Sequence, residues 1–168
     1  MLIRNVSPEY IRIDENVLMR RELTGINDDV LLEVATQVVE KIESNGYCAS
    51  STFNDFLFFP TINIEWNPYL LESVMELTAN IVNVVLIPTT TYLSLTHIFV
   101  GEQYADDEYQ EFVLKLLNEA YDKDFFTTKA EMREWLNERG LINNNLPNFL
   151  EGTQYYYTDE NGSLKRRD

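Results

Sequence analysis

Cysteine is almost missing from this 168-residue chain, which has only Cys48. A single cysteine rules out a disulfide bond within the chain and a zinc site built from cysteine ligands. It also suits a reducing compartment, so we expect the protein in the cytoplasm. A chain of this length can bury enough surface to fold without cross-links.

Glycine and histidine are also scarce: the chain has six glycines and one histidine. The glycine-rich loops that hold phosphates, the nucleophile elbow of hydrolases and the paired histidines of zinc proteases are all absent from the sequence. Thiol catalysis needs a cysteine beside a histidine, and we expect Cys48 and His97 on separate elements. We therefore predict a hydrogen-bonded structural role for His97, no catalytic residue and no cofactor.

Neither a leader peptide nor a membrane span is expected. Residues 1–10 are too few and too polar for a signal peptide. The segment 81–100 (IVNVVLIPTTTYLSLTHIFV) carries no Asp, Glu, Lys or Arg, but Pro88, His97 and several Thr interrupt it and no basic residue flanks it. Because it is rich in β-branched and aromatic residues, it predicts two β-strands joined at 88–90.

Positive charge is absent from a long internal interval. No Lys or Arg lies between Lys41 and Lys115, and the same interval holds ten acids: Glu43, Asp55, Glu65, Glu72, Glu76, Glu102, Asp106, Asp107, Glu108 and Glu111. The whole chain has a formal net charge of −15 and a pI near 4.3. Such a field repels nucleic-acid phosphates and anionic membranes and attracts basic protein surfaces. Direct binding to nucleic acid or to a membrane is therefore not expected.

Two interpretations of this cation-free interval stay open. It can be mostly core, with acids covering the surface that remains, or one face can be kept free of cations for a basic partner. The densest acidic run begins at Glu102, and we predict the partner-binding residues there: Glu102, Asp106, Asp107, Glu108 and Glu111. These residues do not match the calcium-loop pattern of an EF-hand, so no metal site is expected among them.

Four helices are predicted from capping residues and apolar periodicity. Their predicted N-terminal residues are Asn27, Asn67, Asp106 or Asp107, and Thr128. Asparagine and threonine are favoured caps, Pro68 suits a first helical position, and Glu131 completes a capping box. The first helix is expected to end at Gly46 and the fourth at Gly140, where a left-handed glycine is favoured.

Strands are predicted at both ends of the chain and in its middle. We expect a strand at 2–6 and a hairpin of 10–13 with 17–21, with a helix that begins within 19–23 (MRREL) as the alternative for the second arm. Pro60 is expected either to divide 52–66 into two strands or to place it at a sheet edge. In the arm 92–100, apolar residues alternate, which predicts a sheet with one face in water. The core residues expected around the 81–100 hairpin are Val84, Leu86, Leu93, Leu95 and Phe99, with Leu31, Val38, Leu71, Phe112 and Leu116 packed nearby.

A C-terminal hairpin is predicted around Asn161-Gly162, a pair typical of tight turns. The aromatic run 155–157 precedes the basic run 165–167, a combination that also occurs in proteins that bind single-stranded nucleic acid. Alternation in a half-buried strand explains the tyrosines equally well. A small winged-helix arrangement is a further alternative, with the helix 128–139 for recognition and the terminal hairpin as the wing. That helix has balanced charges, however, whereas a recognition helix is expected to be more basic.

Together these patterns predict an α+β fold: a single globular domain over residues 1–168, with an antiparallel sheet covered by about four helices and a C-terminal hairpin. The predicted function is that of a non-enzymatic acidic protein that docks on a basic protein surface. The most specific version is an inhibitor of a nucleic-acid-handling protein, by analogy of charge with DNA-mimic, anti-restriction, anti-CRISPR and toxin-immunity proteins. The alternative is a hydrolase that uses carboxylates and a divalent metal.

Overall fold

The computed structural model describes residues 8–89 and 97–167. The chain divides into two compact units. The first unit comprises Met1–Pro88 and Leu93–Asp106, and the second comprises Thr89–Tyr92 and Asp107–Asp168. Helices and antiparallel strands occur in both, so the fold class is α+β, as predicted. The prediction of a single globular domain over residues 1–168 stays a prediction.

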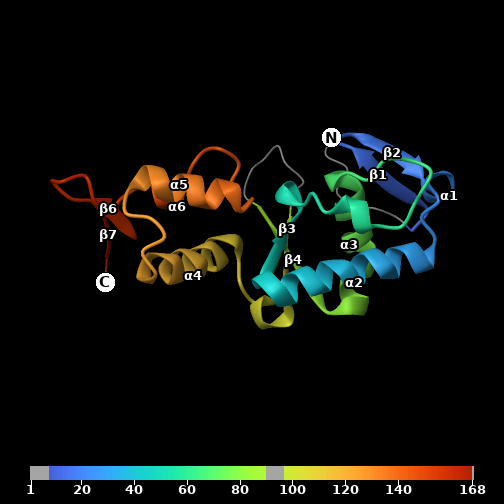
Figure 1. Ribbon diagram of the computed structural model, residues 1–168, viewed down its shortest axis with the longest axis horizontal. Coiled ribbons are helices and arrows are strands. Elements are labelled where there is room, and N and C mark those ends of the chain that lie inside the picture. Colours follow the sequence, from blue (N-terminus) through green and yellow to red (C-terminus); the bar gives the residue numbers. More distant parts are fainter. Residues whose placement is uncertain (1–7, 90–96, 168) are drawn as a thin grey trace. The chain divides into compact units, whose positions relative to one another are not determined.

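The first unit contains two long helices and two small antiparallel sheets (Figure 1). The long helices are α2 (Asp28–Asn45) and α3 (Pro68–Val82). In the larger sheet, the strands lie in the order β3 (Tyr47–Ala49), β5 (His97–Gly101), β4 (Val84–Pro88). The second sheet is the predicted hairpin of β1 (Tyr10–Asp14) and β2 (Val17–Arg20). Shorter elements complete the unit: α1 (Arg21–Thr24), η1 (Ser50–Thr52), η2 (Phe56–Phe58) and η3 (Glu102–Tyr104).

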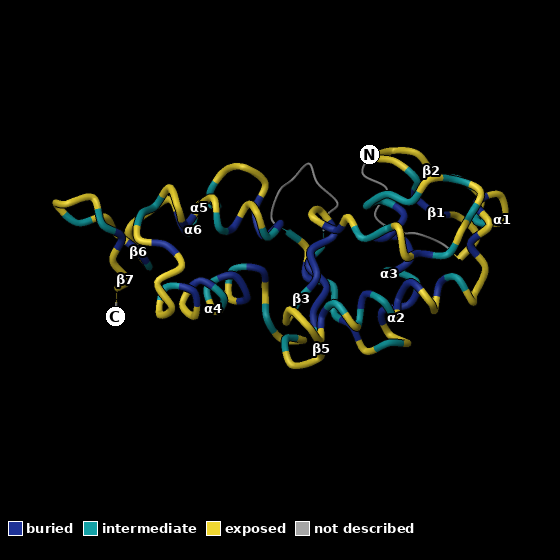
Figure 2. Tube along the Cα trace, viewed as in Figure 1, coloured by how far each residue is buried: buried dark blue, intermediate teal, exposed yellow. Residues whose placement is uncertain are grey.

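The long helices of the first unit begin and end where their capping residues predict. The Asn27 side chain accepts a hydrogen bond from Val30 N at 2.9 Å, and Asn67 does the same for two amides at the start of α3. Gly46 closes α2 with φ 84°, and its N–H donates to the Ile42 carbonyl. The predicted apolar side of α2 is buried, and Figure 2 shows buried and exposed residues alternating along the helix.

Strand β5 lies between β4 and β3, and this central position changes its expected pattern. Ile98, Phe99 and Val100 are all buried. The prediction of a sheet with one face in water is therefore wrong for this strand, because a central strand covered on both sides buries consecutive residues. Val84 and Phe99 are buried in the core, as predicted, whereas Leu86 is only partly buried and packs against it.

Residues 52–66 form no strands, which corrects the prediction of two strands around Pro60. The backbone instead makes the 3₁₀ turns η1 and η2 and then a loop. Three phenylalanines pack ring against ring with centroids 5.1–5.5 Å apart, and Trp66 stands edge-on to the third at 5.1 Å: Phe53, Phe56, Phe59 and Trp66. Such contacts bury the aromatic side chains without a strand partner.

The second unit contains helices α4 (Tyr109–Asp122), α5 (Lys129–Glu138) and the short α6 (Asn148–Glu151). The predicted C-terminal hairpin is present as β6 (Tyr156–Thr158) and β7 (Leu164–Arg166). Its turn is closed by Asp159, whose carboxylate accepts from the N–H groups of Asn161 and Ser163 at 2.9 Å each. Tyr156 and Leu164 are buried beneath the hairpin.

Other expectations need correction or lie outside the described residues. Helix α4 begins at Tyr109 instead of Asp106 or Asp107, because Glu108 and Glu111 form a reciprocal capping box. Phe112 and Leu116 belong to the second unit and not to the core around β5. The predicted strand at 2–6 and the core residues Leu93 and Leu95 lie outside the described residues. The single predicted sheet is replaced, among the residues described, by three small sheets.

Among the described helices, none combines the length and the apolar character that a membrane crossing requires.

The central strand generates a stability prediction. Phe99 has no exposed surface, so Phe99→Ala is expected to lower the free energy of unfolding by about 3–5 kcal/mol through lost burial and a new cavity. Leu57→Ala is the control, because Leu57 is 88% exposed and its truncation should change stability by less than about 0.5 kcal/mol. Urea unfolding of both variants measures the difference, and equal losses would contradict the assigned core.

Candidate functional site

The five acidic residues predicted to bind a partner are divided between the two units. Glu102 begins η3 and Asp106 follows it, both in the first unit and both exposed. Asp107, Glu108 and Glu111 belong to the second unit. Each group therefore has to be considered within its own unit.

The acids of the second unit have structural tasks at the start of α4. Both carboxylate oxygens of Asp107 lie 2.6–2.7 Å from Lys115 Nζ, so this charge is neutralised. The Glu108 N–H donates to Glu111 Oε2 at 3.1 Å within the capping box. Reversing these three residues to lysine would therefore disturb the first turn of α4 as well as the surface charge.

A longer acidic surface lies on helix α2, where sequence reasoning assigned no site. Asp29, Glu33, Glu40 and Glu43 are all exposed and stand at positions i, i+4, i+11 and i+14. This spacing places them on one side of the helix, which we call the acidic face of α2. The helix was predicted from Asn27 and its apolar period, so its exposed carboxylates could have been found from the same pattern.

An exposed apolar loop is fixed beside the acidic face of α2. We call residues 55–58 the apolar loop. Leu57 is 88% exposed and Phe58 is 72% exposed, whereas the neighbouring Phe53 and Phe59 are buried. The Gln37 side chain donates to the Phe58 carbonyl at 3.0 Å, and Lys41 pairs with Asp55. Gln37 lies within one helical turn of Glu33 and Glu40, so the loop borders these carboxylates.

The cations of the first unit are engaged within the unit. Among its described residues, fifteen Asp and Glu face four Lys and Arg; the described part of the second unit has twelve and eight. Arg12 is buried, with its guanidinium 5.1 Å from the centre of the Tyr69 ring. The others pair with carboxylates: Arg20 with Glu22, Arg21 with Asp28, and Lys41 with Asp55. The acidic excess is thus concentrated in the first unit.

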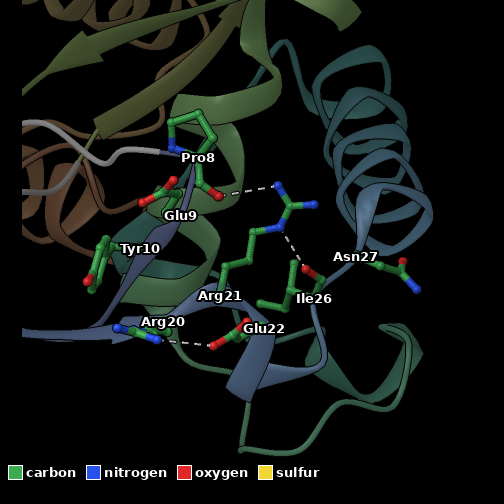
Figure 3. A pocket seen from close by; sticks show the side chains of 8 residues that line it. All are labelled: Pro8, Glu9, Tyr10, Arg20, Arg21, Glu22, Ile26 and Asn27. Carbon is green, nitrogen blue, oxygen red and sulfur yellow. Dashed lines mark hydrogen bonds and ion pairs between the residues drawn. The ribbon is translucent and has the colours of Figure 1, made fainter.

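Two of these arginines line a pocket of about 600 Å³ beside the β1–β2 hairpin. Figure 3 shows the Arg21 guanidinium turned toward the backbone carbonyls of Pro8 and Ile26, at 3.5 and 2.8 Å. The Arg20 side chain points toward Glu22. Because both guanidinium groups already have acceptors, the pocket offers little attraction to an anionic ligand.

A buried carboxylate joins three elements of the first unit. Glu72 on α3 is 1% exposed, and its Oε1 accepts from His97 N at 2.7 Å and from the Ser50 hydroxyl. Its Oε2 is hydrogen-bonded to His97 Nδ1. His97 stands at the start of β5 and Ser50 in η1, so this carboxylate connects helix, strand and 3₁₀ turn. The predicted hydrogen-bonded role of His97 is confirmed.

Glu76 lies one helical turn after Glu72 and completes the group that we call the Glu72–His97 cluster: Ser50, Glu72, Glu76 and His97. One ligand atom each from Glu72, Glu76 and His97 lies within 4.8 Å of the others. Imidazole nitrogen and carboxylate oxygen are both ligand types that divalent metal ions accept. In the sequence, Glu72 and Glu76 are two of the ten acids of the cation-free interval, and no local signal separates its buried from its exposed carboxylates.

Burial and charge shift the titration of this cluster. Burial lowers the pKa of His97, but the hydrogen bond to Glu72 and the charges of both glutamates outweigh it, so the pKa lies above 6.5. Burial raises the pKa of Glu76 above its ordinary value of 4.5, and the charge of His97 only partly offsets this. Burial likewise raises the pKa of the Cys48 thiol to about 12, so this thiol is protonated at neutral pH and is a poor nucleophile.

Comparisons of the chain with protein-family models, with curated proteins and with solved structures gave no match. The function is therefore inferred from the geometry and charge of the chain itself.

Removing the buried carboxylate is expected to weaken the first unit. Glu72→Ala leaves the Ser50 hydroxyl, the His97 amide and the His97 ring without their acceptor, and should cost about 3–5 kcal/mol of unfolding free energy. Glu33→Ala, at an exposed position of α2, should change it by less than about 0.5 kcal/mol. Thermal and urea unfolding compare the two variants, and a loss below about 1 kcal/mol for Glu72→Ala would contradict this role.

The same cluster predicts how stability depends on pH. Since the pKa of His97 is raised in the folded state, its contribution is complete below the unfolded value of about 6.5 and is lost as pH rises through the folded value. Unfolding free energy in EDTA-containing buffer should therefore fall as pH increases above about 6.5. His97→Gln should be less stable at pH 6 and should show a flatter profile above it. Parallel profiles for the two proteins would refute the assignment.

Proposed function

We propose that the protein docks on a basic protein surface and acts by binding alone. The observation that carries this proposal is the charge of the first unit, where fifteen carboxylates face four cations among the described residues. Three of these cations pair with acids and the fourth is buried. A partner with a cationic surface would therefore meet a negative field with little local positive charge, which speeds association.

The acidic face of α2 and the neighbouring apolar loop support this proposal together. Carboxylates attract and orient a basic surface, but exposed charge pairs contribute little affinity. Affinity comes mainly from a few large apolar side chains that become buried on binding. Leu57 and Phe58 supply such side chains beside Glu33 and Glu40, so the partner is expected to present an apolar pocket flanked by lysines or arginines.

The five acids predicted from the sequence keep a part in this proposal within their own units. Glu102 and Asp106 add to the negative surface of the first unit, and Glu108 and Glu111 are exposed in the second. Asp107 contributes less, because Lys115 neutralises it. The acidic face of α2 is therefore the better place to test the function.

The more specific version of the proposal concerns the identity of the partner. Proteins that handle nucleic acid carry cationic grooves for phosphates, and an acidic protein with a net charge of −15 can occupy such a groove. We propose an inhibitor of this type, acting in the cytoplasm, where a chain with one cysteine would remain reduced. Competition between double-stranded DNA and this protein for the captured partner tests this version.

Charge reversal on α2 is the decisive experiment. The triple variant Glu33→Lys, Glu40→Lys and Glu43→Lys changes exposed residues, so the fold should be retained. Basic proteins captured from the native host by the wild type serve as partners. Their association rate with the variant should fall at least about tenfold. The rate for the wild type should also fall as salt rises, because the Debye length drops from about 10 Å at 0.1 M to about 3 Å at 1 M.

The matched control places three lysines elsewhere in the chain. Glu119, Glu134 and Glu160 are exposed residues of the second unit, and their reversal changes net charge equally. A localised binding face predicts a much smaller effect for this control. Equal effects of the two triple variants, or a rate independent of salt, would show that the acidity serves solubility alone.

A further inference from the structure

We propose that Glu72, Glu76 and His97 bind one divalent transition-metal ion of the zinc class. Their ligand atoms lie within 4.8 Å of one another, on two adjacent turns of α3 and at the start of β5. Zinc bound by imidazole nitrogen and carboxylate oxygen at about 2.0–2.2 Å needs ligand atoms about 3.4 Å apart. To reach this spacing, Glu72 Oε2 and His97 Nδ1 would move apart from their hydrogen-bonded contact, and the partly buried Glu76 side chain would complete the set.

Hydrogen bonds already orient Glu72 for this task. Its Oε1 is held by His97 N and the Ser50 hydroxyl, which leaves Oε2 facing His97 Nδ1. A metal ion would take the place of the proton between Oε2 and Nδ1, which is released to solvent; the neutral imidazole then carries its hydrogen on Nε2, and the bonds to Oε1 remain. Hydrogen bonds of this kind to a ligating carboxylate fix its position and strengthen metal binding.

Charge around the cluster favours a divalent cation. Glu72 and Glu76 bring two negative charges, while Arg12 acts on Glu76 and His97 with one positive charge. With His97 neutral, a net negative charge is left in a largely buried site, where electrostatic attraction is strong.

The donor set selects among metals. Calcium prefers six to eight oxygen ligands, and magnesium keeps several waters around one or two carboxylates. One imidazole and two carboxylates suit zinc, cobalt or iron. Three protein ligands leave a fourth position for water, as in catalytic zinc sites. Such a site would supply the first requirement of the alternative function, a metal-dependent hydrolase.

Titration of the 168-residue protein, freed of metal with EDTA and then dialysed, tests the proposal with ZnCl₂ as the probe. We expect one ion per chain and a rise in melting temperature that EDTA reverses. MgCl₂ and CaCl₂ at the same concentrations should leave the melting temperature almost unchanged. CoCl₂ should give the visible absorption of a four-coordinate site with nitrogen and oxygen ligands.

Two variants decide whether the cluster is the site. Glu76→Gln removes one ligand at a partly exposed position, and zinc affinity should fall at least tenfold while circular dichroism stays the same. Glu33→Gln makes the same chemical change on the exposed face of α2 and should leave zinc affinity unchanged. Equal zinc affinity in wild type and Glu76→Gln, or several weak ions per chain, would overturn the proposal. Capture of basic partners in EDTA-containing buffer tests docking without bound metal. Failure of the zinc proposal can therefore be told apart from failure of the docking function.

Discussion

Glu72 is the residue on which the arrangement of the first unit depends. A carboxylate withdrawn from water is costly unless its oxygens are hydrogen-bonded, and here three donors from two other elements supply those bonds. Helix α3, strand β5 and the turn at Ser50 must therefore meet at one place for the charge to be tolerated. A purely apolar contact would allow these elements to slide, whereas this network accepts one register. Phe99 on β5 and Leu71 on α3, each next to or near a residue of this network in the chain, belong to the same hydrophobic core.

Much of the secondary structure could be predicted because its signals are local. Asn27, Asn67 and Thr128 cap helices in the structure as they do in the sequence pattern, and Gly46 and Gly140 take the left-handed conformation after their helices. The cap of α4 is Glu108, one or two residues after the predicted Asp107 or Asp106, because several neighbouring acids can each cap a helix. Only the reciprocal bonds of Glu108 and Glu111 decide among them. Residues 52–66 were missed because ring packing replaced the ladder that their composition suggested.

The site could not be predicted because its members are far apart in the chain. No residue near Glu72 in the sequence distinguishes it from the exposed Glu102. Helical spacing predicts only that Glu76, four residues later, lies on the same side of the helix. Its contact with His97 spans 25 positions and depends on how β5 pairs with β4. Charge counting along the chain singled out residues 102–111 and gave no weight to the exposed carboxylates of α2. Most of the excess of acids belongs to the first unit. That Arg21 and Lys41 are neutralised there can be seen only from their contacts with Asp28 and Asp55 in the structure.

The position of Leu57 and Phe58 beside α2 also affects how copies of the protein meet one another. Exposed aromatic and aliphatic side chains usually promote self-association. Here two copies approaching through this loop would bring two rows of carboxylates together, and their repulsion would act before the apolar side chains touched. A cationic surface meets no such barrier. The same carboxylates that would attract a basic partner would therefore oppose contact between two copies of the loop.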